Sequence, residues 1–209
     1  MYVGMAKEQR KENLDAMQSS RSAGNPAARL LEAARDLFYE QGYTGAGIND
    51  IIARSNTSKK SFYRYFPTKQ KLGEAYLKWQ TRDLIRFLDW LESKAKSYDH
   101  FCDLWARSMI RISGSADYRG CPFSNAMAQA PDDFQAMVRD VHELTVLRLQ
   151  EILKVYKPCK DPGDGFRRVA EGMLIQYLGA VHVWKLSGNQ DSFKLMGRMM
   201  KAIPGTGMG

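Results

Sequence analysis

The segment SNTSKKSFYRYFPTK, Ser55 to Lys69, is the most informative part of this 209-residue chain. The wider window from Ile51 to Gly73 contains six Lys or Arg residues and neither Asp nor Glu, although the whole chain has 23 acidic residues. Two Phe and two Tyr residues are interspersed with these bases. A surface that presents bases and excludes acids attracts a polyanion. Charge alone is also compatible with an ordinary solvated surface, so the decision depends on how the segment folds.

Local signals predict where the first helix of this region begins and ends. Asn25 is a favourable N-cap residue, and Pro26 suits the first helical position because its missing N–H is not needed there. Apolar residues then recur at helical spacing as far as Gly42, which predicts that the helix ends after Gln41.

Two further short helices are predicted on either side of a tight turn. Isoleucines mark a helix at 48–55, and Asn56 tolerates the left-handed conformation that the turn requires. Ser58 can cap a third helix at 59–66, which Pro67 ends. Two short helices joined by about four residues form a helix-turn-helix unit.

The third helix has two different faces on a helical wheel. Phe62 and Phe66 share one side, where they can pack against the first two helices, and Lys60 and Arg64 share the opposite side. Arg pairs with O6 and N7 of guanine, Lys can reach the same atoms, and Ser and Tyr hydroxyls donate to phosphates. Lys69, at the start of the next helix, is expected to contact the DNA backbone. The residues predicted to bind DNA are Asn49, Thr57, Ser58, Lys59, Lys60, Ser61, Tyr63, Arg64, Tyr65 and Lys69.

The rest of the chain also has helical periodicity, and no segment shows strand alternation between turn signals. We therefore expect an all-α protein of about nine helices, with an N-terminal three-helix helix-turn-helix domain and a C-terminal helical domain. The expected parts are a flexible basic arm at 1–25, the DNA-binding domain at 26–70, a second helical domain at 71–204, and a disordered tail at 205–209.

The excess of positive charge is denser in the N-terminal part. Residues 1–80 carry 13 basic and 8 acidic groups, a net charge of +5, and the longer remainder carries 18 and 15, a net charge of +3. This distribution again points to a polyanionic partner for the N-terminal domain.

Several classes of protein are disfavoured by what the sequence lacks. The chain has three cysteines, Cys102, Cys121 and Cys159, and no two of them form a CxxC motif. The histidines are scattered as well, so neither a disulfide framework nor a metal site is predicted. The apolar runs are too short for a membrane span and no signal-peptide pattern is present, so we expect a cytoplasmic, nucleoid-associated protein without a membrane partner. Nucleotide-binding, hydrolase and metalloprotease motifs are also absent, so we expect neither an enzyme nor a cofactor.

The segment ARLLEAARDLFYEQGYTGAGINDIIARSNTSKKSFYRYFPTKQKL resembles the DNA-binding domain of the TetR family of bacterial transcriptional regulators. The resemblance covers roughly residues 27–72 and is most specific in SFYRYFPTK. Ala46-Gly47 replaces the Thr-Ser that commonly begins the second helix, so its N-cap must come from elsewhere, and Ser55-Asn56 replaces a common Ala-Gly. Lys60 occupies a position often filled by Gly on the predicted DNA-facing side, so the base preference of relatives cannot be transferred.

The resemblance implies a homodimer that places its two third helices in successive major grooves of a near-palindromic double-stranded operator, about 34–36 Å apart. It also implies that the last two helices, expected at 166–186 and 192–203, form a four-helix bundle with those of the partner. Gly172, Gly179 and Ala180 would allow the close approach of helices in that bundle, or they relieve packing within one subunit.

In this family the C-terminal domain usually holds a small-molecule pocket, so the resemblance implies an effector-binding and dimerisation domain at 71–204. The aromatic and Met residues of this domain suit either a cavity for apolar ligands or an ordinary core. Its polar groups either orient a ligand or form hydrogen bonds within the core. The candidate effector-binding residues are Trp105, Met109, Cys121, Phe123, Asn125, Phe134, His142, Met173, Gln176 and Tyr177.

The stretch RGCPFSNAMAQAPDDF, residues 119–134, contains a Gly-Cys pair and resembles a TetR subgroup that includes regulators of the response to reactive electrophiles and oxidants. Arg119 and the helix expected to begin at Cys121 would both lower the pKa of this thiol, and a thiolate can be alkylated or oxidised. The alternative is that Cys121 is a small buried apolar residue.

These observations favour a one-component transcriptional regulator, in the first place a repressor that a small-molecule or thiol-reactive effector releases from its operator. Such an effector must bind the released form better than the DNA-bound form. One alternative is an activator or a non-regulatory DNA accessory protein of the same fold. Another is an interaction protein whose basic segment binds an acidic partner.

Overall fold

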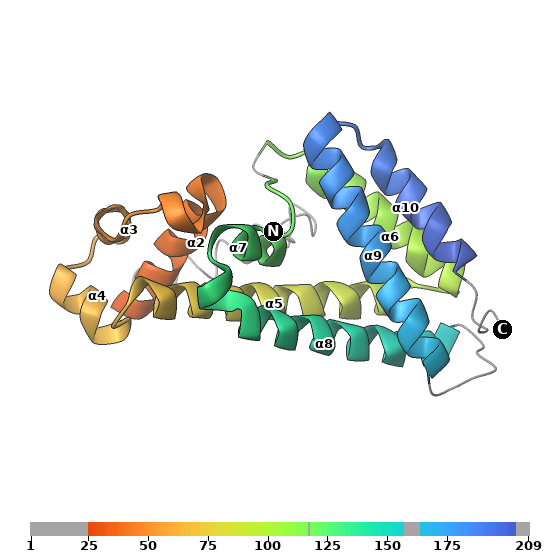
Figure 1. Cartoon of the computed structure of the whole chain (residues 1–209), viewed down its shortest axis with the longest axis horizontal. Coiled ribbons are helices and arrows are strands. Elements are labelled where there is room, and N and C mark those ends of the chain that lie inside the picture. The colour runs from red at the N-terminus through yellow and green to blue at the C-terminus, as the bar shows by residue number, and fades with distance from the viewer. Residues whose placement is uncertain (1–24, 117, 157–163, 204–209) are drawn as a thin grey trace. The chain divides into compact units, whose positions relative to one another are not determined.

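The computed structural model describes residues 25–116, 118–156 and 164–203 (Figure 1). Almost all of the predicted N-terminal arm, the predicted tail and Cys159 lie outside these residues. The described residues form nine α-helices and no strand, which confirms the all-α prediction. The helices are α2 (Pro26–Gly45), α3 (Ile48–Ser55), α4 (Lys59–Tyr65), α5 (Lys69–Lys94), α6 (Tyr98–Ser113), α7 (Pro122–Gln129), α8 (Pro131–Tyr156), α9 (Asp164–Ser187) and α10 (Asp191–Ala202).

The predicted caps and turn of the helix-turn-helix are confirmed. The Asn25 side chain accepts a hydrogen bond from the Ala27 N–H at 3.0 Å, and the Ser58 hydroxyl oxygen accepts one from the Ser61 N–H at 3.1 Å. Asn56 has φ 47° and ψ 50°, the left-handed conformation expected of the turn. These local hydrogen bonds satisfy N–H groups that have no partner inside their own helices.

The region around Gly42 differs from the prediction that the first helix ends after Gln41. Gly42 has φ 80° and ψ 165°, which breaks the helical conformation, but the chain resumes a helical turn that ends at Gly45. Glycine is suited to this kink because it adopts positive φ without a steric penalty. Helix α3 then starts from Gly47 without a side-chain cap hydrogen bond, whereas the absence of Thr-Ser led us to expect a cap from elsewhere.

The chain divides into two compact units, and each is assembled from two separate segments. Among the described residues, the first unit contains everything up to Arg82 together with 122–138, and the second contains 83–121 and the chain from Arg139 onwards. Helices α5 and α8 each contribute one part to both units. The first unit therefore holds more than the 26–70 segment expected as a domain, because α7 and the start of α8 pack with the helix-turn-helix.

The first unit has a core of aliphatic and aromatic side chains. Leu30, Ile51, Phe62 and Leu72 are completely buried and come from α2, α3, α4 and α5. Burying side chains of this size contributes roughly 1.5–3 kcal/mol each, so four helices are held together by residues that the helical periodicity placed inward.

The second unit is packed around aromatic residues of α5, α6 and α9. The Trp105 ring lies 6.3 Å from Phe87, 5.9 Å from Phe101 and 5.7 Å from Tyr177, measured between centroids. Helix α10 packs closely on α6 because Gly197 has no Cβ, which would come within 2.9 Å of the Ala106 methyl carbon.

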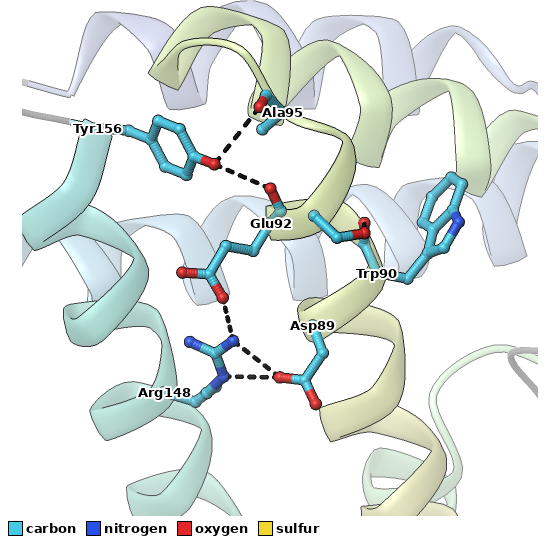
Figure 2. A network of polar contacts seen from close by, with 7 residues as sticks. Asp89, Trp90, Glu92, Ala95, Arg148 and Tyr156 are labelled. Carbon is cyan, nitrogen blue, oxygen red and sulfur yellow. Dashed lines mark hydrogen bonds and ion pairs between the residues drawn. The ribbon is translucent and has the colours of Figure 1, made fainter.

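Polar contacts connect α5 and α8 inside the second unit (Figure 2). The Arg148 guanidinium binds the Asp89 carboxylate at 2.8 Å and also the Glu92 carboxylate. The Tyr156 hydroxyl donates to the Glu92 carbonyl at 2.8 Å. One arginine thus bridges two acids a turn apart on the neighbouring helix, a geometry that suits the forked donors of Arg.

Candidate nucleic-acid interface

Helix α4 buries one face and exposes the other, as the helical wheel predicts. Phe62 is completely buried, and its ring lies 6.5 Å from that of the half-buried Phe66. Lys60 and Arg64 are exposed on the opposite face. Neither makes an ion pair with an acid within the described parts of the chain, so both charges are available to an external partner.

The ten residues predicted to contact DNA all belong to α3, α4, the turn between them or the first residue of α5. The exposed members are Asn49, Ser58, Lys59, Lys60, Tyr63 and Arg64, and the half-buried members are Thr57, Ser61, Tyr65 and Lys69. The fold therefore brings these residues together in one unit, and their contacts with DNA remain predictions.

The hydroxyl groups of Thr57 and Ser58 already have local partners. The Thr57 and Ser55 hydroxyl oxygens are 2.8 Å apart, and the Ser58 oxygen caps α4. A hydroxyl has one hydrogen and two lone pairs, so the Ser58 oxygen can accept from the Ser61 N–H and still donate to a phosphate.

The Arg64 guanidinium is held by its neighbour Tyr65. Its central carbon lies 4.6 Å from the centroid of the Tyr65 ring, and one of its nitrogens donates to the Tyr65 hydroxyl. Tyr65 can therefore orient Arg64 instead of contacting phosphate itself. A cation held over an aromatic face loses less side-chain freedom on binding.

Lys69 is less free than its place in the sequence suggests. Its ammonium donates to the Thr44 carbonyl at 3.4 Å and lies 4.7 Å from the centroid of the Tyr43 ring. Burial lowers the pKa of Lys69, and the nearby negative charge of Asp133 acts in the opposite direction.

Four residues around Lys69 could not be found from the sequence. The Tyr43 hydroxyl donates to the Asp133 carboxylate at 3.1 Å, and the Thr44 N–H and hydroxyl both donate to the Gln129 side-chain oxygen at 3.2 Å. These partners are 90 and 85 residues apart in the chain. No local pattern relates them, so only the folded structure could identify the contacts.

The candidate effector-binding residues fall into both compact units. Phe123, Asn125 and Phe134 belong to the first unit, and the other seven belong to the second. Asn125 and Phe134 line a pocket of about 20 Å³ in the first unit, which is room for about one water molecule. The pocket is also lined by Phe38, Tyr39, Tyr43, Tyr76, Leu77, Pro122, Ala126 and Gln129.

Four of the candidates in the second unit form its buried interior. Trp105, Met109, Met173 and Tyr177 are all at most 4% exposed. The Trp105 indole N–H is buried and has no hydrogen-bond partner within the described residues. A buried donor without an acceptor lowers the stability of the fold, so this N–H is a candidate hydrogen-bond donor to a ligand oxygen.

The other polar candidates and Cys121 differ from one another in how deeply they are buried. His142 is exposed, so it does not lie among the buried aromatic residues, and Gln176 is half-buried. Cys121 is 5% exposed, and the Arg119 guanidinium donates to the Ala116 carbonyl. The burial of Cys121 restricts the access of reagents to its thiol, which favours the small buried apolar residue over the reactive thiol among the two alternatives.

Two further classes of site find no support in the residues that the structure describes. His, Cys, Asp and Glu side chains nowhere gather in a group of three or more that could hold a metal ion. None of the helices there combines the length and the apolar character that crossing a membrane requires.

Known proteins resemble this chain in sequence and in structure. The model of the bacterial regulatory proteins of the tetR family matches residues 30–76. The HTH-type transcriptional repressor Rv3405c of Mycobacterium tuberculosis is 42% identical over 152 residues, which are 72% of this chain and 70% of that protein.

The similarity of fold extends over most of the chain. The crystal structure of SCO4454, a TetR-family transcriptional regulator from Streptomyces coelicolor, matches with a TM-score of 0.72 and 24% identity, covering 85% of this chain and 94% of that one. The solved structure of a cysteine mutant of CifR, a TetR family transcriptional regulator, complexed with 26-bp double-strand operator DNA matches with a TM-score of 0.70 and 17% identity, covering 84% of this chain and 95% of that one.

The sequence match to Rv3405c extends well beyond the helix-turn-helix, and the exposed cationic face of α4 is the feature by which such a protein would read DNA. The chain therefore belongs to the TetR family of DNA-binding transcriptional regulators.

Proposed function

We propose that the protein is a transcriptional repressor that binds a near-palindromic operator as a homodimer and is released from it by an effector. The observation that carries the proposal is the geometry of α4, where the buried Phe62 fixes the helix and directs the exposed cations Lys60 and Arg64 outwards. Arg and Lys at these positions suit the acceptor pattern of guanine in the major groove. The repressor Rv3405c, 42% identical, supports the direction of control.

An exposed apolar stripe on α9 supports the homodimer. Ile175, Leu178, Val183 and Leu186 are 39–76% exposed and recur at helical spacing, and α10 adds Leu195 and Met199, both more than 40% exposed. Apolar side chains in such a row mark a protein–protein contact. We therefore place the interface between subunits on α9 and α10.

The small residues of α9 have two possible roles, packing within the subunit and close approach of a partner's helix. A Cβ on Gly172 would come within 3.2 Å of Ile203 of the same chain, and Ala180 is 7% exposed, so these two residues serve packing within the subunit. A Cβ on Gly179 would meet no atom within 4 Å. Gly179 lies between Leu178 and Val183, where it would let the helix of a second subunit approach closely.

For the effector we propose a small molecule that binds among the buried aromatic residues of the second unit and presents an oxygen to the Trp105 N–H. A thiol-reactive effector would instead have to reach Cys121 when the surrounding structure opens. Cys121→Ser separates the two possibilities. It should leave DNA binding intact and abolish release by a thiol-alkylating reagent, measured as loss of binding to a selected duplex. Release that persists in the variant would exclude Cys121 as the sensor.

The test of the proposal is selection of bound duplexes from a random DNA pool at near-physiological salt, followed by sequencing. Enrichment of a palindrome supports a dimeric operator-binding regulator, and its position relative to a promoter separates repression from activation. If the protein bound DNA without enriching any sequence, and salt weakened this binding uniformly, α4 would not recognise bases. Phosphate contacts alone carry no sequence information.

A further inference from the structure

The segment at residues 42–47, which leads from α2 into α3, is held by side chains from α7 and α8. Gln129, the last residue of α7, accepts hydrogen bonds from both the N–H and the hydroxyl of Thr44 at 3.2 Å. Asp133, in the first turn of α8, accepts from the Tyr43 hydroxyl at 3.1 Å. All of these residues belong to the first compact unit.

The backbone is adapted to this contact at two glycines. A Cβ on Gly42, which has φ 80°, would come within 2.5 Å of the Gln129 side-chain oxygen. A Cβ on Gly73 would come within 2.6 Å of Phe134 and 2.9 Å of Tyr43, whose rings pack edge to face with centroids 4.7 Å apart. The contact between the 42–47 segment and the start of α8 is therefore close packed as well as hydrogen bonded.

The same segment binds Lys69. The Lys69 ammonium donates to the Thr44 carbonyl and lies over the Tyr43 ring, so both of its partners are the residues that Gln129 and Asp133 hold. Gln70, the next residue, donates to the Asp133 backbone carbonyl at 3.3 Å. Burial and the hydrogen bond to Asp133 raise the pKa of Tyr43, so its hydroxyl remains a donor.

We propose that Gln129 and Asp133 are positioning residues for DNA binding, which act by holding Tyr43 and Thr44 and thereby place the Lys69 ammonium and the start of α3 beside the DNA. This inference rests on the proposed function, because it assumes that Lys69 and Asn49 contact the operator. It adds two residues of α7 and α8 that touch no DNA themselves. Since their side chains hydrogen bond to the 42–47 segment, their loss should change how the protein binds DNA more than whether it folds.

The test compares Asp133→Ala with Asp132→Ala. Asp132 is exposed in the same first turn of α8, so both variants remove one negative charge from the same helix end. The readouts are the Kd for a duplex selected by the wild-type protein, the slope of log K against log salt, and the thermal midpoint. We expect Asp133→Ala to bind about tenfold more weakly than Asp132→Ala, the loss of roughly one hydrogen bond per subunit. Its salt slope should fall by about one per subunit, because the Lys69 contact with phosphate is lost.

Tyr43→Phe is the second variant, because it keeps the ring under Lys69 and removes only the hydroxyl. It should weaken operator binding in the same direction with little change in thermal midpoint. Equal affinities of Asp133→Ala and Asp132→Ala, or a lower thermal midpoint with an unchanged salt slope, would overturn the inference. If the wild-type protein selected no sequence at all, the proposed function would fail and this inference with it. If the wild-type protein selected a sequence but Asp133→Ala and Tyr43→Phe bound it as tightly as the wild type, the inference would be overturned and the proposed function would stand.

Discussion

Helices α4 and α9 are both amphipathic, but their exposed faces have opposite chemistry. Helix α4 buries Phe62 and exposes the cation Arg64, and α9 buries Tyr177 and exposes Leu178. The buried faces are alike because both pack on neighbouring helices of the same chain. The outer face of each helix therefore indicates its partner: exposed cations suit a polyanion, and apolar side chains suit another protein surface.

We expect the strongest effect from a substitution on the buried face of α4. Phe62→Ala should lower the free energy of unfolding by about 3–5 kcal/mol, because it removes a completely buried ring and leaves a cavity. Denaturant unfolding followed by circular dichroism measures the loss. Tyr63→Ala is the control, since Tyr63 is 44% exposed and its substitution should lower the free energy of unfolding much less. Equal losses in both variants would mean that Phe62 does not hold α4 in place.

The next effect tests the apolar face of α9. Leu178→Asp should weaken the dimer by about 2–4 kcal/mol, because an unpaired charge would be buried at the proposed interface. Sedimentation equilibrium over a range of protein concentrations measures the change. Val155→Asp on α8 is the control, since Val155 is 66% exposed and lies outside α9 and α10. Dissociation by both variants, or by neither, would move the interface away from α9.

A smaller effect tests the cationic face of α4. Arg64→Ala should cost about 1–3 kcal/mol of operator binding and relax the preference at one base position in each half-site. Binding to duplexes changed at single positions measures both. Arg86→Ala is the control, because Arg86 is an exposed arginine of α5 in the other compact unit. A uniform loss over all duplexes would assign Arg64 to a phosphate instead of a base.

The smallest effect concerns charges that are paired within the chain, in contrast to those of α4. The Arg167 side chain at the start of α9 hydrogen bonds to Glu143 at 2.7 Å and holds the pKa of that carboxyl below its ordinary value of 4.5. A lowered folded-state pKa stabilises the protein above the ordinary value, and this stability is lost as the pH falls through the lowered value. The wild-type thermal midpoint should therefore decline more steeply over this range than that of Glu143→Gln. Parallel declines would show that the exposed pair contributes nothing measurable.

The helix-turn-helix could be predicted almost completely because its signals are local. The Asn25 and Ser58 caps act on N–H groups two or three residues away, and Asn56 forms its turn by itself. Gly42 was predicted to end a helix, yet it marks a kink, because a glycine locates the break in conformation without specifying whether the next residues resume a helix.

The candidate site was predictable only in part, for a related reason. The exposed and buried faces of α4 follow from helical spacing, so Arg64 and Phe62 could be assigned from the sequence. Apart from Cys121, the candidate effector-binding residues are assigned from their type within helical stretches, and the structure places the whole set in both compact units, with His142 on the surface. Aromatic and Met residues occur in every helical core, so their type does not distinguish a lining from ordinary packing.

The all-α fold, the helix-turn-helix and the two faces of α4 follow from the amino-acid sequence, because each depends on residues within a few positions of one another. Three other features follow from tertiary packing: α7 and the start of α8 join the DNA-binding unit, Lys69 lies against Tyr43 and Thr44, and Gly179 faces outwards. These contacts join residues up to 90 positions apart. They depend on how whole helices pack, and packing is a property of side-chain shapes brought together in space, which no local pattern specifies.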